Sequence, residues 1–261
     1  FPTRRSSDLN AFSAEQITGL TTSALRAIES RDMIGFTTDQ MAALSSDQLS
    51  AFSYGQISAL NSSSIGAIRA EELSGLSSAQ VAAFTMAQIR VMSAEQMSAL
   101  STLQIRGFET RDIAGFTSDQ LSAFNSAQLS AFTTAQIVAL NSLQISGINA
   151  AEILGLNTAQ IRAIELRDLG GLTAEQITGL DSTQLAGFGT SQIQIMSTAQ
   201  IAGFGVEDIS GLSSAQIAAL NSAQLASLTT TQITALDSNQ LAAIEVADIA
   251  GLTTSQIRSE E

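Results

Sequence analysis

The carboxylates of this sequence are the residues whose type and spacing could support chemistry. Seven of them recur at one constant spacing, which is broken by a single shorter interval between Glu152 and Asp168. The seven are Asp32, Glu72, Asp112, Glu152, Asp168, Asp208 and Asp248. Because carboxylate oxygens are ligands that Ca²⁺ prefers, one hypothesis is a ladder of calcium sites. This spacing brings few oxygens to any one site, whereas Ca²⁺ takes about six to eight. We therefore expect capping and salt links to account for the seven acids.

Few other residues offer a reactive group. The chain has no His and no Cys, so a Ser hydroxyl has no imidazole partner, and a zinc site built on Cys or His is excluded. Glu71 and Glu72 are adjacent, which points them in different directions on a helix. The Gly-rich nonapeptide of calcium-binding β-rolls is absent. We predict that the chain is not an enzyme, that it has no catalytic, cofactor-binding or metal-binding residues, and that it needs no cofactor.

The acids belong to a repeat of eight residues, which runs 31 times from Phe12 to Ser259. Position one of this octad is Leu, Phe, Ile or Met, and position six is Ile, Leu, Met or Val. Position five is Gln in 22 octads, and position eight is Ala or Gly in 27. In the octads with Gln, position two is Ser, Thr, Asn or Asp, with Gly189 as the only exception. The constant spacing of the seven acids is five octads, and the shorter interval is two octads.

Each octad with Gln carries a complete helix-start signal, as residues 212–219 illustrate. Ser213 is of the type that caps a helix N-terminus, because its side-chain oxygen accepts a hydrogen bond from a backbone N–H. Gln216, three residues later, completes a capping box, and Leu212 and Ile217 form a hydrophobic staple around it. The octad therefore predicts one helix of about one and a half turns. Such a short helix is marginal alone, so neighbours must stack to bury positions one and six.

The predicted fold class is an all-α solenoid of very short capped helices, one for each octad. One continuous helix is excluded, because eight residues at about 100° each would make the apolar stripe drift by about 80° per octad. The alternative is a β-solenoid, since short periods are also typical of β-coils. Ala, Gln and Leu prevail over Val and Tyr, which favours helices over strands.

The seven octads with an acid at position five are expected to differ from the others. All seven have Gly at position eight, and six lack a good capping side chain at position two. We predict that each fuses with the octad before it, which gives a longer helix about every five octads. Thr21 would cap one such helix, and Gly35 would end it in the left-handed conformation. The ion pairs expected on these helices are Arg26–Glu29, Arg106–Glu109 and Arg162–Glu165.

The two ends of the chain are expected not to be native protein. Residues 1–9, FPTRRSSDL, and residues 258–261, RSEE, both back-translate in frame to a common sequencing-library adapter. The alternative is a basic, Ser-rich N-terminal arm. We predict that residues 10–257 form a single octad-repeat solenoid and are a fragment of a longer protein.

The charge of the chain restricts its partners. The net charge is −13 and Lys is absent, which repels nucleic acid and anionic membranes. Residues 172–180, LTAEQITGL, resemble the opening helix of the DNA-reading repeats of TAL effectors, but the charge argues against DNA binding. No apolar run approaches the roughly 20 residues of a membrane span. We expect no nucleic acid partner and no membrane insertion, and the sequence does not indicate an oligomeric state.

The motif L-T/S-T/S-x-Q-I/L-x-A in long tandem resembles the octapeptide-repeat regions of very large bacterial surface or secreted proteins of the adhesin type. Some of these are named haem utilisation or adhesion proteins. The resemblance covers nearly all of residues 10–257. It implies a structural or adhesive segment, located outside the cell or on its surface, with protein or cell-surface ligands as partners. Only Tyr54 and the Met residues are available as weak haem ligands, so haem binding in this segment is not expected.

Two other functions fit the same pattern. A protein-binding α-solenoid is one alternative, because helical repeats often bind proteins. An ice-binding solenoid is another, because Thr-Thr, Ser-Ser and Asn-Ser pairs recur at positions two and three. Capping already accounts for position two, which favours a structural role over ice binding.

Deleting the whole octad 220–227 should lower the melting temperature little, because stacking between neighbours is rebuilt. Deleting Ala223 alone should lower it much more, because every following Leu or Ile leaves the buried face. Each such side chain contributes roughly 1.5–3 kcal/mol when fully buried. Equal melting temperatures for the two deletions would show that the octad is not the structural unit.

Overall fold

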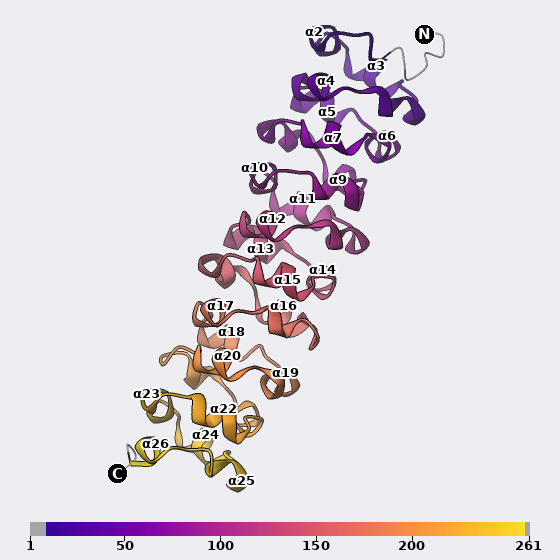
Figure 1. The fold of residues 1–261 in the computed structure, drawn as a ribbon. Coiled ribbons are helices and arrows are strands. Elements are labelled where there is room, and N and C mark those ends of the chain that lie inside the picture. The colour runs from indigo at the N-terminus through magenta and orange to yellow at the C-terminus, as the bar shows by residue number, and fades with distance from the viewer. Residues whose placement is uncertain (1–8, 259–261) are drawn as a thin grey trace. The chain divides into compact units, whose positions relative to one another are not determined.

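A computed structural model describes residues 9–258 of the chain, and every regular element in that range is a helix. The chain divides into two units, residues 1–139 and residues 140–261. In each unit, short helices follow one another in a stack of turns (Figure 1). The prediction of an all-α solenoid of short helices is confirmed. The β-solenoid alternative is wrong, because the described residues contain no strand.

The helices of each unit are four to six residues long, or three in the shortest 3₁₀ helices. Those of unit 1 are α2 (Ala14–Thr18), α3 (Thr22–Arg26), η1 (Ser30–Gly35), α4 (Thr38–Ala43), α5 (Ser46–Ser50), α6 (Tyr54–Ala59), α7 (Ser62–Gly66), η2 (Ala70–Gly75), α8 (Ser78–Val81), α9 (Met86–Arg90), α10 (Ala94–Ser98), α11 (Thr102–Gly107), η3 (Thr110–Gly115), α12 (Ser118–Ser122), α13 (Ser126–Ala131) and α14 (Thr134–Val138). Those of unit 2 are α15 (Ser142–Ser146), η4 (Ala150–Gly155), α16 (Thr158–Ala163), η5 (Leu169–Gly171), α17 (Ala174–Thr178), α18 (Ser182–Leu185), α19 (Thr190–Ile195), α20 (Thr198–Ala202), η6 (Ile209–Gly211), α21 (Ser214–Ala218), α22 (Ser222–Ser227), α23 (Thr230–Thr234), α24 (Ser238–Ala242), α25 (Val246–Ile249) and α26 (Thr254–Arg258).

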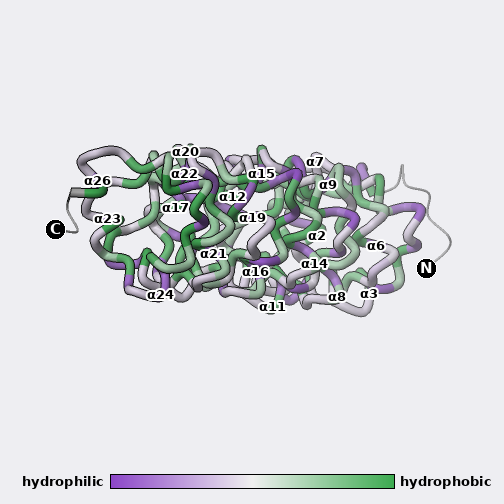
Figure 2. The backbone as a smooth tube through the Cα atoms, turned by 90° about the horizontal axis from the view of Figure 1, so that it is seen from below, coloured by the Kyte–Doolittle hydropathy of each residue, from purple (hydrophilic) through white to green (hydrophobic). Residues whose placement is uncertain are grey.

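The core consists of the two apolar positions of the octad. Position six is at most 2% exposed from Ile17 to Ile233, and position one is buried from Phe36 to Ile244. Apolar stretches therefore recur at short intervals along the backbone (Figure 2). In unit 1, Phe rings at position one also meet edge to face, as Phe116 and Phe124 do at 5.9 Å. Stacking thus buries the residues that a single short helix could not.

Helices pack against partners three octads away in the chain. In unit 1, α5 packs against η2 and α6 against η1, and in unit 2 α20 packs against α22. Hydrogen bonds between successive turns join residues that are 28 and 31 apart. One turn of the solenoid therefore takes between three and four octads.

The predicted fused helices are wrong. Thr21 caps α3, but this helix ends at Arg26, and a separate 3₁₀ helix, η1, begins after Glu29 in an extended conformation. The chain straightens here because Ile28 lies between the two helices and its carbonyl accepts a hydrogen bond from Gln56 in the next turn. A continuous helix would use this carbonyl internally. The acid octads form 3₁₀ helices, except for the last, which forms α25.

The ion pairs predicted from those fused helices are also wrong. Each glutamate pairs instead with the Arg two residues after it, because the chain is extended where the continuous helix was expected. The observed pairs are Glu29–Arg31 at 2.8 Å, Glu109–Arg111 at 2.7 Å and Glu165–Arg167 at 2.6 Å.

The glycines at position eight do not end helices in the left-handed conformation, because no described residue has a positive φ. Several of them permit a close approach of two turns instead. A Cβ on Gly75 would overlap the carbonyl oxygen of Ser46, and one on Gly171 would overlap that of Ser142. The prediction that Gly matters at Gly75 and Gly171 holds, but the reason is the lack of space for a Cβ and not a left-handed backbone.

Most of the predicted adapter residues lie outside the described part of the chain, so that prediction stays a prediction. Leu9 is an exception. It is buried, and its carbonyl accepts a hydrogen bond of 2.8 Å from Gln40. Leu9 thus occupies the place of a position-six residue.

Gly75→Ala should destabilise the protein by roughly 1–3 kcal/mol, because the added methyl group meets backbone atoms of another turn, which cannot move aside singly. Gly19→Ala is the matched control, since a Cβ there would lie 3.5 Å from its nearest neighbour, the Gln16 carbonyl oxygen. This control should be neutral or slightly stabilising. Chemical denaturation measures both effects, and an equal stability of the two variants would contradict the close approach.

Candidate functional site

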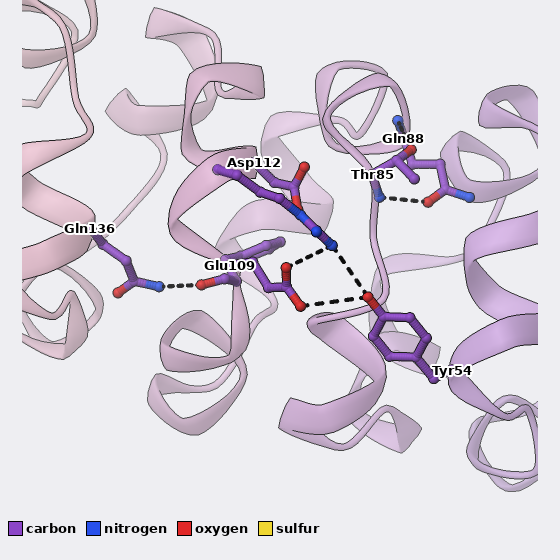
Figure 3. Close-up of polar contacts among 8 residues, drawn as sticks. Tyr54, Thr85, Gln88, Glu109, Asp112 and Gln136 are labelled. Atoms are coloured by element: carbon purple, nitrogen blue, oxygen red, sulfur yellow. Dashed lines mark hydrogen bonds and ion pairs between the residues drawn. The ribbon is translucent and has the colours of Figure 1, made fainter.

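The Gln at position five is the best candidate polar group of the octad, and it first forms hydrogen bonds at the start of its own helix. In the octad of α9, the Thr85 N–H donates to Gln88 Oε1 at 2.8 Å (Figure 3). The Gln88 N–H donates to Thr85 Oγ1 at 3.3 Å. The predicted capping box is therefore confirmed. It recurs at helix after helix in both units, for example at Ser213 and Gln216.

The same glutamines have a second role that the sequence did not indicate. Gln88 Nε2 donates to the carbonyls of Ile57 at 2.9 Å and Leu60 at 2.8 Å, which lie at the C-terminal end of α6. Gln136 Nε2 likewise donates to the carbonyls of Ile105 and Phe108, and the dashed line at Gln136 in Figure 3 marks one such bond. Gln88 is 1% exposed, so these bonds form out of contact with water. Each such side chain bonds the start of its own helix to the end of a helix in the preceding turn.

This glutamine ladder runs through both units. It is defined by Gln side chains whose Nε2 donates to the carbonyl of the position-one residue three octads earlier, and in most cases also to that of the position-six residue just before it. Its members in unit 1 include Gln40, Gln48, Gln56, Gln80, Gln88, Gln96, Gln104, Gln120, Gln128 and Gln136. Those in unit 2 include Gln176, Gln184, Gln192, Gln200, Gln216, Gln224, Gln232, Gln240 and Gln256.

One feature of the sequence could have revealed the ladder. Glu completes a capping box as well as Gln does, yet no octad with a full capping box has Glu at position five. A carboxylate has acceptors only, whereas the amide also has two N–H donors. The exclusive use of Gln therefore indicates that the donors are needed, which a capping box alone does not explain.

The carboxylates of the acid octads invert this arrangement. Glu72 Oε2 accepts from the Ser46 N–H at 2.6 Å, and Asp208 Oδ1 accepts from the Ser182 N–H at 3.0 Å. Ser46 and Ser182 are the first residues of α5 and α18, so the acids cap helices of the preceding turn. The Gly three residues after each acid allows the two backbones to approach closely enough for this bond. Capping thus explains why acid and Gly occur together.

Ion pairs lie on the surface beside some of these acids. In unit 1, Arg111 binds Glu109, and its Nε contacts Asp112 at 3.4 Å. The charge of Glu109, followed by the hydrogen bond to Asp112, raises the pKa of Arg111. The Arg111 side chain is 69% exposed, so the pair contributes little to stability.

Tyr54 lies close to this ion pair. The Arg111 guanidinium donates to Tyr54 Oη at 3.4 Å, and Oη donates to Glu109 at 3.5 Å (Figure 3). Tyr54 on α6 therefore links to η3, 55 to 57 residues later. Its hydroxyl, one of the few weak haem ligands that the sequence offers, is engaged with charged side chains.

Two other features are absent from the part of the chain that the structure describes. Within residues 9–258, no group of three or more carboxylates gathers in a way that could hold a metal ion. No helix in that part of the chain is long and apolar enough to cross a bilayer.

Gln136→Glu should destabilise the protein by roughly 2–4 kcal/mol, because a buried carboxylate would face two carbonyl oxygens without a donor. The matched control is Gln16→Glu. Gln16 forms the same capping box with Ser13, but its side chain is exposed, so Glu should be tolerated there. Equal losses in the free energy of unfolding would mean that the ladder bonds contribute nothing beyond the cap.

Comparison with known proteins supports the five-octad period. The ALTTAQ repeat model matches residues 25–62, 65–102, 105–142 and 161–198. The first three matches begin five octads apart, and the fourth begins seven octads after the third, which is one period plus the two-octad interval noted in the sequence. None of the curated proteins compared with the chain matches it. Because the four matches cover more than half of the 261 residues, the chain belongs to the ALTTAQ repeat family.

Proposed function

We propose that the chain is a structural and adhesive repeat segment of a large bacterial surface or secreted protein, without catalysis. The observation that carries this proposal is the use of the recurring polar side chains. Gln at position five and the cap at position two bond to backbone groups, and so do Glu72, Asp168 and Asp208 of the acid octads. In the described residues, no buried side-chain nitrogen or oxygen lacks a hydrogen-bond partner. The distinctive residues therefore maintain the solenoid.

The period of the sequence supports the same proposal. Turns are joined by bonds between residues 28 and 31 apart, whereas the sequence period is five octads. One period therefore exceeds one turn by more than a whole octad. Equivalent residues of successive periods rotate around the axis within each unit, so they do not line up on one face. Such a surface suits a segment that serves as an extended spacer and makes weak contacts in several directions.

A protein-binding α-solenoid is the second candidate, and one observation favours it. Tyr54 is 47% exposed and lies beside the exposed Arg111. Tyr and Arg are enriched among the residues that dominate binding energy at protein interfaces. The pair occurs in one place in the described residues, so this candidate predicts one local binding surface.

The two candidates differ in how binding depends on length. We would measure binding of residues 10–257 to immobilised host-matrix proteins, beside a variant lacking the five octads of residues 12–51. For a structural and adhesive segment, binding is weak and falls roughly in proportion to the octads removed, while Tyr54→Ala leaves it unchanged. If Tyr54→Ala abolished binding while the shortened variant bound as tightly as residues 10–257, the result would contradict the proposal and favour the protein-binding solenoid.

A further inference from the structure

Gly189 is the one residue that breaks the capping rule in an octad with Gln at position five. Its φ of −74° and ψ of 156° are ordinary extended values that any residue adopts. A Cβ on Gly189 would lie 3.6 Å from Gln192 Oε1, an ordinary contact, and would meet nothing nearer. Neither backbone conformation nor space therefore requires Gly here. Gly187 differs, because a Cβ there would lie 3.0 Å from the Thr158 Cα.

The missing side chain adjoins an open hollow of about 520 Å³ in unit 2. This volume lies within the range of small-molecule sites, roughly 300–1,000 Å³. The residues around it come from α16, α19 and the starts of the octads at Phe188 and Leu212. They include Arg162, Phe188, Gly189, Thr190, Ser213 and Gln216.

Arg162 supplies the charge of the hollow. Its Nε–H donates to the Gly187 carbonyl at 3.2 Å, which holds the guanidinium in place. Unlike Arg167, which binds Glu165 and Asp168, Arg162 forms no ion pair with a carboxylate of residues 9–258. Its two terminal NH₂ groups therefore remain as donors suited to an oxyanion.

The other polar groups favour a hydroxylated ligand. Thr190 is exposed at the hollow and carries a hydroxyl that can donate or accept. The Ser213 hydroxyl donates to Gln216 Oε1 at 2.9 Å and accepts from the Gln216 N–H at 3.3 Å, so one lone pair of its oxygen remains to accept. Gln216 Nε2 is committed to the carbonyls of Leu185 and Phe188 in the ladder. The available set is thus one guanidinium and two hydroxyls.

We propose that this hollow binds a sugar acid, with the carboxylate on Arg162 and ring hydroxyls on Thr190 and Ser213. A planar guanidinium matches a carboxylate through two parallel hydrogen bonds. Gly189 keeps the space that a capping side chain would enter. The inference rests on the adhesive part of the proposed function and adds one sugar-acid site to the weak protein contacts that are spread over the octads.

Isothermal titration of the full chain with glucuronate and with glucose tests the proposal. Glucuronate should bind at one site per chain, and added salt should weaken it, whereas glucose should not bind measurably. Arg162→Gln should weaken glucuronate binding by about tenfold or more, the scale of a lost charge-assisted contact. Gly189→Ser should weaken it similarly without lowering the melting temperature, because Ser restores a cap.

Arg106→Gln is the matched control, because Arg106 also occupies position seven of the octad before an acid octad. It should leave binding unchanged. Equal binding of glucose, unchanged affinity in Gly189→Ser, or an equal loss in Arg106→Gln would each overturn the proposal. These outcomes are separate from the structural role, which is read from melting temperatures and from the length dependence of matrix binding.

Discussion

The glutamine side-chain amide is the group on which the rest of the structure depends. Helices of four to six residues leave most of their terminal N–H and C=O groups without partners inside the helix. The Oε1 atom accepts from the cap residue at the start of its own helix, while Nε2 donates to carbonyls at the end of a helix one turn earlier. One buried side chain thus satisfies both kinds of terminus. Burial makes the alternative, an unpaired amide or carbonyl, expensive.

The acid octads show that the turns need not all be joined in one way. Where the amide is replaced by a carboxylate, as at Glu72, the bond between turns reverses, and a helix N–H becomes the donor. The absent Cβ of Gly75 allows the two backbones to come together for this bond. The acid and the Gly therefore form one device, which recurs with the five-octad period of the ALTTAQ family.

Local features of the fold could be predicted from the sequence, because their causes lie within eight residues. The capping box at Ser213 and Gln216 depends on residues of the same octad. The octad pattern also marks Leu212 and Ile217 as side chains to be buried, although the stacked turns supply that burial. Features that depend on the number of residues in one turn could not be predicted from the sequence. The Nε2 partners of Gln216 lie 28 and 31 residues away, and nothing in an eight-residue repeat states that distance.

The same limit explains the errors. Glu29 and Gly35 were assigned to a fused helix because the lack of a cap and a terminal Gly are local helix signals. The carbonyl of Ile28, which the next turn engages through Gln56, requires an extended residue there instead. At the candidate site, Gly189 was visible as an exception in the sequence, but the hollow beside it needs Arg162 and Ser213 from other turns.

Hydrogen exchange of the glutamine side-chain amides, followed by NMR, tests the ladder most directly. Gln194 is exposed and serves as an internal reference, whereas Gln88 and Gln136 are buried in the ladder. The Nε2 protons of Gln88 and Gln136 should exchange far more slowly than those of Gln194, because two backbone carbonyls accept them. Exchange at the rate of Gln194 would contradict the account, since it would mean that the amides do not join the turns.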